Sequence, residues 1–484
     1  MNWIDYILWK KGGSGGGVSV EALSVVQNGT YTAPSGSAYS PVSVNVPAGG
    51  GSKPRKDVNF FDYDGTIVES YTAQEAAALS ALPANPSHDG LTAQGWNYTL
   101  AQMKAEVTAQ GKCDIGQMYI TDDGKTRVYV TIPEGRTHPY LGLGVNGTVV
   151  VDWGDGSETS TLTGTSLTSV KDTDHVYAAP GDYVITLEVT SGSYSIFGTN
   201  GTHLFKNSAG TPSNPARVYA NAIRKVEIGA SASIGNYAFS YCSSITAVTI
   251  PSGITSIGND AFQNCYSITA VTIPSGVTSI GSYVFSNCAS ITAVTIPSGV
   301  TSLGIYVFQS CSSLTAVTIP SGVTSIGNYV FQSCSSLTAV TIPSGVTSLG
   351  NNVFQNCSSL SEATIPSGVT SIGTNAFQYC YSLTAVTIPS GVTIIGNSAF
   401  SNCYSLTAVT IPSGVTSIGT NAFQNCYGLA ELHFLPATPP AVSSSNAFSS
   451  LPTDCIIYVP AGTLEAYTTA TNYPSSSTYT YVEE

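Results

Sequence analysis

The chain has 484 residues, and only 9% of them are charged, against about 25% in an average soluble domain. The formal net charge is −13, all 15 Lys and Arg residues lie at or before Lys225, and the remainder of the chain has eight acidic residues and no basic one. That second half therefore cannot neutralise phosphates, which excludes nucleic-acid binding and disfavours anionic membrane surfaces. No stretch approaches the ~18 apolar residues of a membrane span, so membrane insertion is not expected.

The N-terminal region consists of short segments joined by glycine. Residues 1–17 predict an attachment segment that ends in a flexible linker. Charged residues interrupt and follow its apolar run, which is not typical of a signal peptide. Residues 18–52 alternate apolar and polar positions around Asn28-Gly29, which predicts a β-hairpin module followed by a second glycine joint.

Residues 53–135 predict a small α+β module. It should contain a strand at 58–61, helical stretches around 72–82 and 100–109, and a hairpin over 117–132.

An aspartate pair follows the first of these strands. Asp62 and Asp64 stand in Phe60-Phe-Asp-Tyr-Asp-Gly-Thr66, which resembles the nucleophile motif of haloacid-dehalogenase phosphatases. That family also needs Mg²⁺, a Lys and a downstream acidic pair on a parallel sheet. Because hairpin patterns follow within about 70 residues, we favour a strand-end turn capped by its own aspartates. No enzyme and no cofactor are expected.

Residues 136–190 predict an all-β domain, and residues 191–216 a connector rich in Ser, Gly and Asn. The segment Val151-Asp-Trp-Gly-Asp-Gly-Ser157, together with the later His175-Val-Tyr, resembles the PKD-type immunoglobulin-like sandwich. Three aspartates of this domain are candidate Ca²⁺ ligands, although such residues more often cap tight turns. They are Asp152, Asp155 and Asp182.

The dominant feature is a 23-residue unit that repeats nine times in register between Tyr237 and Leu429. A fixed period of this length predicts a solenoid over residues 217–434, in which each unit buries its apolar edge only by stacking on its neighbours. Residues 435–484 depart from the period and should cap the open end. The predicted fold class is therefore mainly β, a leucine-rich-repeat solenoid preceded by a sandwich and a small α+β module.

Within one unit, alternation predicts which side chains face the interior. Val317 and Ile319 should point inward from a short strand, Gly327 should form a corner, and Phe331 and Cys334 should point inward from a helical turn. Nine or ten rungs at ~4.8 Å each would stack. We interpret the periodic cysteines, one per rung, as a ladder of buried free thiols, with disulfides between rungs as the alternative.

The pattern L-x-x-V-x-I-P-x-x-V-x-x-I-G-x-x-A/V-F-x-x-C resembles the BspA-like leucine-rich repeats of bacterial and microbial surface proteins. That resemblance implies adhesion or ligand binding without catalysis. Residues 18–47 and 59–119 are similar to modules of phage tail and structural proteins. This second resemblance implies that the N-terminus attaches to other virion proteins.

The variable positions of the repeat contain the candidate binding residues. Tyrosines recur at one position before the phenylalanine and at another directly after the cysteine, and rows of exposed tyrosines can stack on sugars or anchor a protein. The alternative is that they cover the rung corners and shield the backbone. Specificity could also involve Asp260, Glu362 or the C-terminal segment. The candidates are Tyr237, Tyr266, Tyr283, Tyr306, Tyr329, Tyr381, Tyr404 and Tyr427.

These patterns favour a non-enzymatic component of a phage virion, in the tail or a fibre, that recognises a glycan or protein receptor on a bacterial surface. The first alternative is a bacterial cell-surface adhesin that binds a host protein or glycan. The second is a rigid structural spacer. Homo-oligomerisation stays open.

Overall fold

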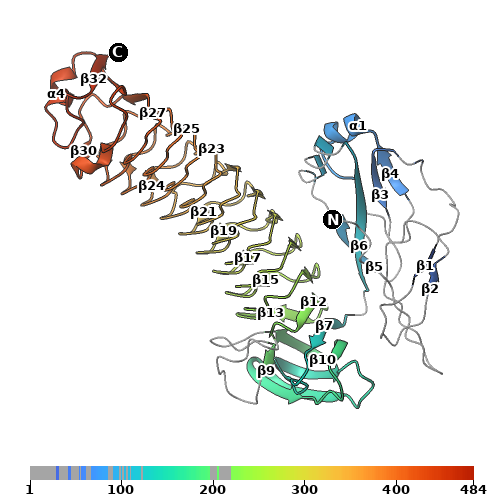
Figure 1. Cartoon of the computed structure of the whole chain (residues 1–484). Helices are drawn as coiled ribbons and strands as arrows, with labels where there is room; N and C mark the ends of the chain where they lie inside the picture. Colours follow the sequence, from blue (N-terminus) through green and yellow to red (C-terminus); the bar gives the residue numbers. More distant parts are fainter. Residues whose placement is uncertain are drawn as a thin grey trace. The chain divides into compact units, whose positions relative to one another are not determined.

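The computed structural model describes residues 29–31, 42–44, 54, 56–61, 67–84, 91–96, 100, 103–104, 107–108, 111–121, 124–196, 204–206 and 220–484. The chain divides into two compact units, Met1–Asp123 and Gly124–Glu484 (Figure 1). Both are mainly β, as the sequence predicts. The predicted attachment segment and both glycine joints lie outside the described residues, as does most of the predicted connector.

The first unit begins with the predicted hairpin. Strands β1 (Gly29–Tyr31) and β2 (Val42–Val44) pair antiparallel, with Gly29 opposite Val44. Gly29 therefore lies inside a strand, and the turn that we placed at Asn28-Gly29 is wrong. The connection between the two strands spans residues 32–41 instead.

A four-stranded sheet in the order β4-β3-β6-β5 forms the rest of the first unit. Its core combines sheet residues such as Val58 and Phe60 with Ala76 of the single labelled helix and with Met103. The described residues between 100 and 108 are helical, as predicted. The elements are β3 (Val58–Phe61), β4 (Ile67–Tyr71), α1 (Ala73–Ala78), β5 (Leu91–Trp96) and β6 (Cys113–Thr121).

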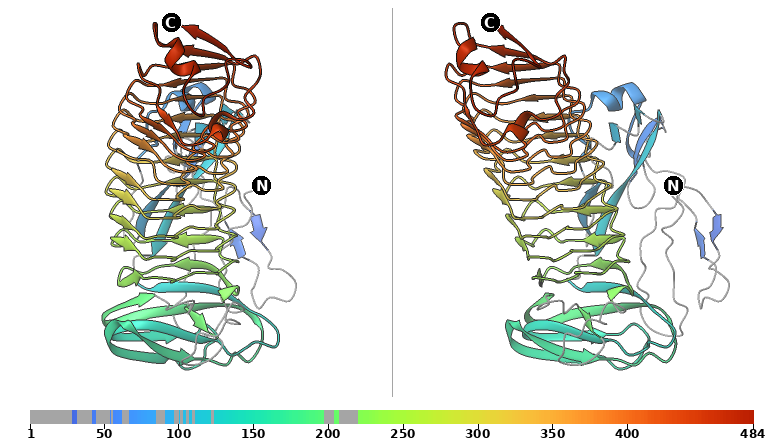
Figure 2. Two further views of the ribbon diagram at one scale, coloured as in Figure 1. Left: turned by 90° about the vertical axis from the view of Figure 1, so that its left-hand side faces the viewer. Right: turned by 60° about the vertical axis from the view of Figure 1, so that its left-hand side comes forward.

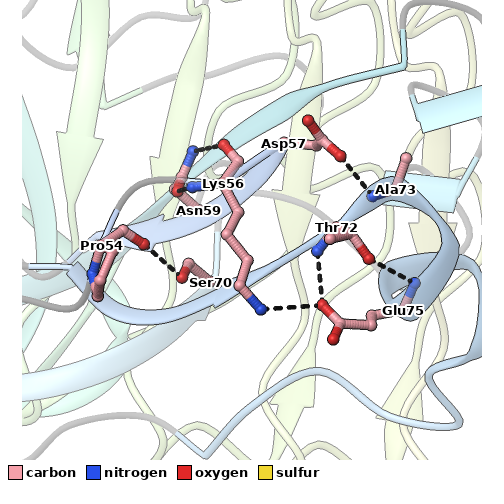
Figure 3. A network of polar contacts seen from close by, with 8 residues as sticks. All are labelled: Pro54, Lys56, Asp57, Asn59, Ser70, Thr72, Ala73 and Glu75. Atoms are coloured by element: carbon pink, nitrogen blue, oxygen red, sulfur yellow. Dashed lines mark hydrogen bonds and ion pairs between the residues drawn. The ribbon is translucent and has the colours of Figure 1, made fainter.

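Polar contacts fix the short helix α1 to this sheet (Figure 3). The Thr72 hydroxyl accepts a hydrogen bond from the Glu75 backbone, and the Glu75 carboxylate accepts one from the Thr72 backbone at 2.7 Å, which is a capping box. Lys56 pairs with the same carboxylate at 3.1 Å, and Asp57 accepts the Ala73 N–H at 2.9 Å. Residues directly before β3 and directly after β4 therefore hold the start of a helix too short to be stable alone.

The hairpin expected over 117–132 does not form. Strand β6 pairs with β3 and β5, whereas β7 (Thr126–Ile132) pairs with strands of the second unit. The reason is burial, because Val128 and Val130 belong to the core of that second unit. The boundary between the two units thus falls after Asp123, earlier than the boundary at residue 135 predicted from the sequence.

Strand β7 belongs to a curled sheet at the start of the second unit. β8 pairs with β9, β10 and β11, and β10 also pairs with β7 and β13, so all these strands belong to one hydrogen-bonded sheet. Strands β8 and β9 lie within residues 136–190, which the sequence predicts to be all-β. The long strands are β8 (Tyr140–Asp152), β9 (Ser160–Asp174) and β10 (Gly181–Ile196), and β11 (Phe205–Lys206) is a short strand at the edge.

This sheet continues directly into the solenoid. β7 pairs antiparallel with β12, the first strand of one face of the solenoid, and β10 pairs parallel with β13, the first strand of the other face. Because β7 and β10 also pair with each other, they close the N-terminal end of the stack. β10 extends to Ile196, well into the segment predicted as a connector.

The solenoid has two columns of short parallel strands (Figure 2). Strands on successive rungs pair 23 residues apart, for example Val271 with Val294. The first column contains β12 (Ile223–Glu227), β14 (Ala247–Thr249), β16 (Ala270–Thr272), β18 (Ala293–Thr295), β20 (Ala316–Thr318), β22 (Ala339–Thr341), β23 (Glu362–Thr364), β25 (Ala385–Thr387), β27 (Ala408–Ile411), β29 (Glu431–Phe434) and β31 (Ile456–Val459). The second contains β13 (Ala232–Ile234), β15 (Ser256–Ile257), β17 (Ser279–Ile280), β19 (Ser302–Leu303), β21 (Ser325–Ile326), β24 (Ser371–Ile372), β26 (Ile394–Ile395), β28 (Ser417–Ile418) and β30 (Ala441–Val442).

In the interior, the phenylalanine and cysteine positions of the repeat are each occupied by the same residue type in successive rungs. Phenylalanines stack from Phe239 to Phe448, with neighbouring ring centroids 5.3 to 5.9 Å apart. The cysteines are buried free thiols, as predicted. Each of those from Cys265 to Cys426 donates to a phenylalanine carbonyl of the preceding rung, as Cys334 does to Phe308 at 3.1 Å. Burial raises the pKa of Cys311 to about 12, which keeps such thiols protonated and unreactive.

The stack extends beyond the predicted end at residue 434. β31 adds a further rung to the first column, Phe448 of η1 (Ser445–Phe448) extends the phenylalanine stack, and Cys455 is buried like the earlier cysteines. Helix α4 (Leu464–Thr468) and β32 (Thr480–Glu483), which pairs parallel with β31, close the end. The buried Tyr467 packs 5.1 Å from Phe434, so aromatic rings cover the last rung.

Candidate binding surface

The third side of each rung is a corner segment that follows the second strand. It begins at a glycine such as Gly327, where an added Cβ would lie 2.7 Å from the Gly304 carbonyl oxygen of the preceding rung. Only glycine permits that approach. The next residue is often asparagine, and the Asn328 side chain accepts the Asn351 N–H of the following rung at 2.7 Å.

Two left-handed residues shape each corner. Tyr329 and Ser333 have φ of 62° and 59°, and equivalent residues recur in the other rungs. Between them, Phe331 donates its N–H to the Val353 carbonyl of the next rung at 2.9 Å. The segment is therefore a third ladder between rungs, and our prediction of a helical turn is wrong. A right-handed helix has negative φ throughout, so these two left-handed residues are incompatible with one.

We call the tyrosines and the aspartate at the first left-handed position the half-buried row. Tyr306 stacks between Tyr283 and Tyr329, with centroids 4.5 and 4.3 Å apart and ring planes within 13° and 8°. Burial and the neighbouring rings raise the pKa of Tyr306. Since both faces of Tyr306 are covered, no ligand ring can stack on it. The row consists of Tyr237, Asp260, Tyr283, Tyr306 and Tyr329.

The tyrosines directly after the cysteine form the exposed row, which comprises Tyr266, Tyr381, Tyr404 and Tyr427. Tyr404 lies 4.8 Å from Tyr381 and 5.2 Å from Tyr427 by ring centroid, while 40–55% of each of these side chains is exposed. Tyr379 touches the edge of Tyr381 at 6.0 Å. The structure thus brings three predicted residues into one contiguous aromatic patch.

Tyr266 stands apart from that patch, 115 residues before Tyr381, or five rungs of 23. It is 47% exposed, and its hydroxyl donates to the Asn264 side chain at 3.1 Å. The residues at its repeat position on the adjacent rungs are Ser243 and Ala289, which are too small to cover its ring. Tyr266 is therefore an isolated aromatic site.

Glutamines next to the phenylalanines form a polar ladder that we did not predict. The side-chain amide of Gln309 donates to Gln332, that of Gln332 to Gln355, and that of Gln355 to Gln378, at 2.9, 2.5 and 2.6 Å. Their recurrence at one repeat position is the sequence signal that could have revealed it. Because each amide is satisfied by its neighbour, this ladder stabilises the corner without adding charge.

The candidate Ca²⁺ ligands have separate partners. Asp152 accepts the Gly154 N–H and Asp155 the Ser157 N–H, at 2.9 and 3.1 Å, as turn-capping aspartates do. Asp155 also contacts His175 at 2.7 Å. Burial opposes its ionisation, but the hydrogen bonds from Ser157 and His175 outweigh burial and lower its pKa to about 2.

Asp182, the third candidate, accepts a hydrogen bond from the Thr131 hydroxyl at 2.6 Å. Across the described residues, no three His, Cys, Asp or Glu side chains gather as a metal site would require.

The phosphatase-like Asp62 and Asp64 lie outside the described residues, in the segment that connects the antiparallel strands β3 and β4. Glu362 is exposed on β23. Within the described part of the chain, no helix has the length and apolar character of a membrane span.

Stacked parallel rungs with a phenylalanine and leucine interior define a solenoid repeat protein. The solenoid is similar to a known repeat family, because the family model for the "BspA type Leucine rich repeat region" matches in six copies over residues 232–361, 304–430 and 351–457. A search among curated proteins found no match.

Solved structures similar to this chain include a leucine-rich cell surface protein from Faecalibacterium prausnitzii, at 26% identity over 59% of this chain and 93% of that one, with a TM-score of 0.32. A leucine-rich repeat protein from Eubacterium ventriosum has 26% identity over 57% and 75%, with a TM-score of 0.37. The pneumococcal vaccine antigen PcpA has 18% identity over 57% and 82%, with a TM-score of 0.38.

Proposed function

We propose that the protein is a non-enzymatic binding and adhesion protein whose solenoid recognises a receptor through the exposed row. The observation that carries this proposal is the contiguous patch of Tyr381, Tyr404 and Tyr427, each at least 40% exposed. Exposed aromatic clusters are typical of sites that contact sugars or anchor a protein. BspA-type repeats are typically found on surface proteins that bind or adhere, which agrees with this use.

The finer proposal is that the protein is part of a phage particle and binds a glycan or protein receptor on a bacterial surface. It is supported by the glycine joints and by the similarity of residues 18–47 and 59–119 to modules of phage tail and structural proteins. In this proposal the N-terminus attaches to other virion proteins, and the solenoid is available to the receptor.

A bacterial cell-surface adhesin is the second candidate, favoured by the family of the repeats. Genes for capsid and tail proteins beside this gene would support the virion proposal, and their absence would favour the adhesin. Labelling purified phage particles with an antibody against the solenoid provides a direct test. Label on the bacterial surface without label on particles would overturn the virion proposal.

A spacer without a ligand is the third candidate, and the stacking of the half-buried row favours it. Tyr283 and Tyr329 cover the two faces of Tyr306, so that ring has no free face for a partner. These tyrosines alone would support a stiffening role, so the distinction between binding protein and spacer depends on the exposed row.

The test of binding compares the full chain with a variant that carries Tyr381→Ser, Tyr404→Ser and Tyr427→Ser. Serine occupies the same repeat position at Ser312, Ser335 and Ser358, so the variant keeps residues that the fold already accepts. We expect the wild type to bind a subset of a panel of gut bacterial cells and glycans. We expect the triple variant to lose at least tenfold of that affinity.

Thr341→Ser on β22 is the matched control, because Thr341 is exposed on the strand column and not at the corner. It should bind like the wild type. If no cell and no glycan binds the wild type, the spacer is the better proposal. If the triple variant binds as tightly as the wild type, recognition lies on another face.

A shorter protein for the same experiment must start at Gly124. Cutting at residue 217, the predicted start of the solenoid, would remove β7 and β10 and leave the edges of β12 and β13 unpaired. Unpaired edges promote aggregation, which would imitate binding to cells.

A further inference from the structure

Asp260 is the only charged residue between Ile228 and Ser361. It occupies the half-buried row, at a repeat position where the preceding rung has Tyr237 and the following rung has Tyr283. All three have the same left-handed backbone, with φ between 56° and 59°. A single carboxylate therefore interrupts a row of aromatic rings.

Hydrogen bonds between rungs fix this order in space. Tyr237 donates its N–H to Asn259, and Asp260 donates its N–H to Ser282, at 2.8 and 2.9 Å. Tyr237 and Tyr283 are thus two rungs apart, about 9.6 Å at the usual strand spacing. A flat group midway between their rings would lie about 4.8 Å from each, within the ~6 Å reach of a cation–π contact.

The charge of the Asp260 carboxylate affects the pKa of both tyrosines. The charge of Asp260 is the largest cause of the raised pKa of Tyr237, and it contributes, after burial, to the raised pKa of Tyr283. One face of Tyr283 is covered by Tyr306. Because the rings stack along the solenoid axis, its other face is directed toward the rung of Asp260.

The backbone does not require an aspartate at this position. Asn352, Asn375 and Asn421 occupy the same position in other rungs with φ of 55° to 60°, so asparagine suits the left-handed conformation equally well. Burial raises the pKa of Asp260 and outweighs a side-chain hydrogen bond with Tyr237 that lowers it, so ionisation is disfavoured there. No basic residue follows Lys225, and among the described residues no ion pair involves Asp260. The carboxylate thus lacks a cation in a place where asparagine would serve the fold.

We propose that Asp260, Tyr237 and Tyr283 form a slot that binds the guanidinium group of an arginine on a protein partner. The carboxylate would accept two hydrogen bonds from the guanidinium, and the flanking rings would cover its two faces. Arginine fits better than lysine or an amino sugar, because its cation is planar and weakly hydrated, whereas an ammonium is compact and strongly hydrated. This inference deepens the proposed function, and it rests on the solenoid being a recognition surface.

The first experiment uses the full chain with ¹³C-labelled tyrosine rings and follows their NMR signals. The probe is Nα-acetyl-arginine amide, titrated into the wild type, Asp260→Asn and the control Glu362→Gln. Tyr237→Asn and Tyr283→Asn assign the two ring signals, since asparagine is accepted at this position elsewhere in the stack. We expect saturable shifts of both signals in the wild type and in Glu362→Gln, and at least tenfold weaker binding in Asp260→Asn.

Two further probes identify the chemistry. Glucosamine and Nα-acetyl-lysine amide, at the same concentrations, should shift the two signals less than the arginine probe. Equal or larger shifts with glucosamine would replace the protein partner by a cationic glycan and overturn the proposal. An absence of saturable shifts with the arginine probe, or unchanged binding in Asp260→Asn, would also overturn it.

Cell binding separates this inference from the proposed function. If the exposed-row triple variant loses cell binding while the arginine probe fails to bind the wild type, the proposed function stands and the slot is refuted. If the probe binds in an Asp260-dependent way while no cell or glycan binds the wild type, the slot stands and receptor recognition through the exposed row is refuted.

Discussion

The interior of the solenoid and its corner follow the same 23-residue period but tolerate variation differently. In the interior, the phenylalanine position of the repeat is invariant from Phe239 to Phe423, and the cysteine position from Cys242 to Cys426. At the first left-handed corner position, Tyr, Asp, Asn and Ser all occur. An interior side chain must match identical neighbours on both sides, whereas a corner residue needs only a tolerated backbone. The corner can therefore vary to suit a partner without disturbing the interior stack.

The strongest test of this comparison is Phe331→Ala. The substitution leaves a cavity inside a continuous stack, between rings 5.6 Å away on either side, and we expect it to lower the free energy of unfolding by about 3–5 kcal/mol. Denaturant unfolding of the full chain measures the effect. A loss below about 1 kcal/mol would show that the interior is not more demanding than the corner.

A smaller effect is expected for Cys334→Ala, which removes a sulfur and its bond to the Phe308 carbonyl. We expect a loss of about 1–2 kcal/mol in unfolding free energy.

The reactivity of the same cysteine supplies a chemical test, because burial holds the pKa of Cys334 well above its usual range. Iodoacetamide should leave Cys334 unmodified in the folded protein and label it in denaturant, as mass spectrometry can show. Rapid labelling of Cys334 under native conditions would contradict the buried ladder.

The two tyrosine rows should differ from each other. Tyr306→Asn loses two stacked contacts of about 0.5–1.5 kcal/mol each but regains part of the left-handed backbone cost, so the net loss should be about 1–2 kcal/mol. Tyr404→Ser should change unfolding free energy by about 0.5 kcal/mol or less. Thermal unfolding of both variants measures this difference. If Tyr404→Ser is the more destabilising, the exposed row has a structural role.

The smallest effect, with the opposite sign, is expected for Asp260→Asn. A carboxyl whose pKa is raised by burial weakens the fold when it is ionised, so the wild type gains stability as the pH falls through that raised value. Asp260→Asn should therefore unfold at a slightly higher temperature than the wild type at neutral pH. The two midpoints should converge in acid, below the range where Asp260 ionises. A variant that is less stable than the wild type at neutral pH would mean that Asp260 supports the fold.

Periodicity predicted the solenoid because stacking imposes one residue type at each inward position. Ile319, Phe331 and Cys334 are buried as expected. The corner was mistaken for a helical turn because its left-handed residues include tyrosine and serine, which do not indicate that conformation as glycine does. Two repeat positions four residues apart are occupied only by Asn, Asp, Tyr or Ser from Tyr237 to Asn425. The recurrence of asparagine there was the signal that could have indicated left-handed residues.

The closure of the stack by β7 and β10 could not be predicted, because it depends on pairing between segments that are distant in the sequence. Ile223, for example, pairs with Val130. In the sequence, the strand at Thr126–Ile132 looks like half of a local hairpin, and only the structure shows which edge it covers. For the candidate site, both tyrosine positions could be predicted from the repeat, but their contacts could not. It could not show which row is stacked and which is exposed.

Closure at both ends has an evolutionary consequence. β7 and β10 cover the first rung, and Tyr467 covers the last, so the units between them meet only units like themselves. A recombination event that duplicated or deleted one unit would lengthen or shorten the stack by about 4.8 Å and leave both covers intact. The reach of the protein can thus change across generations in fixed increments, while the surfaces that end the stack stay the same.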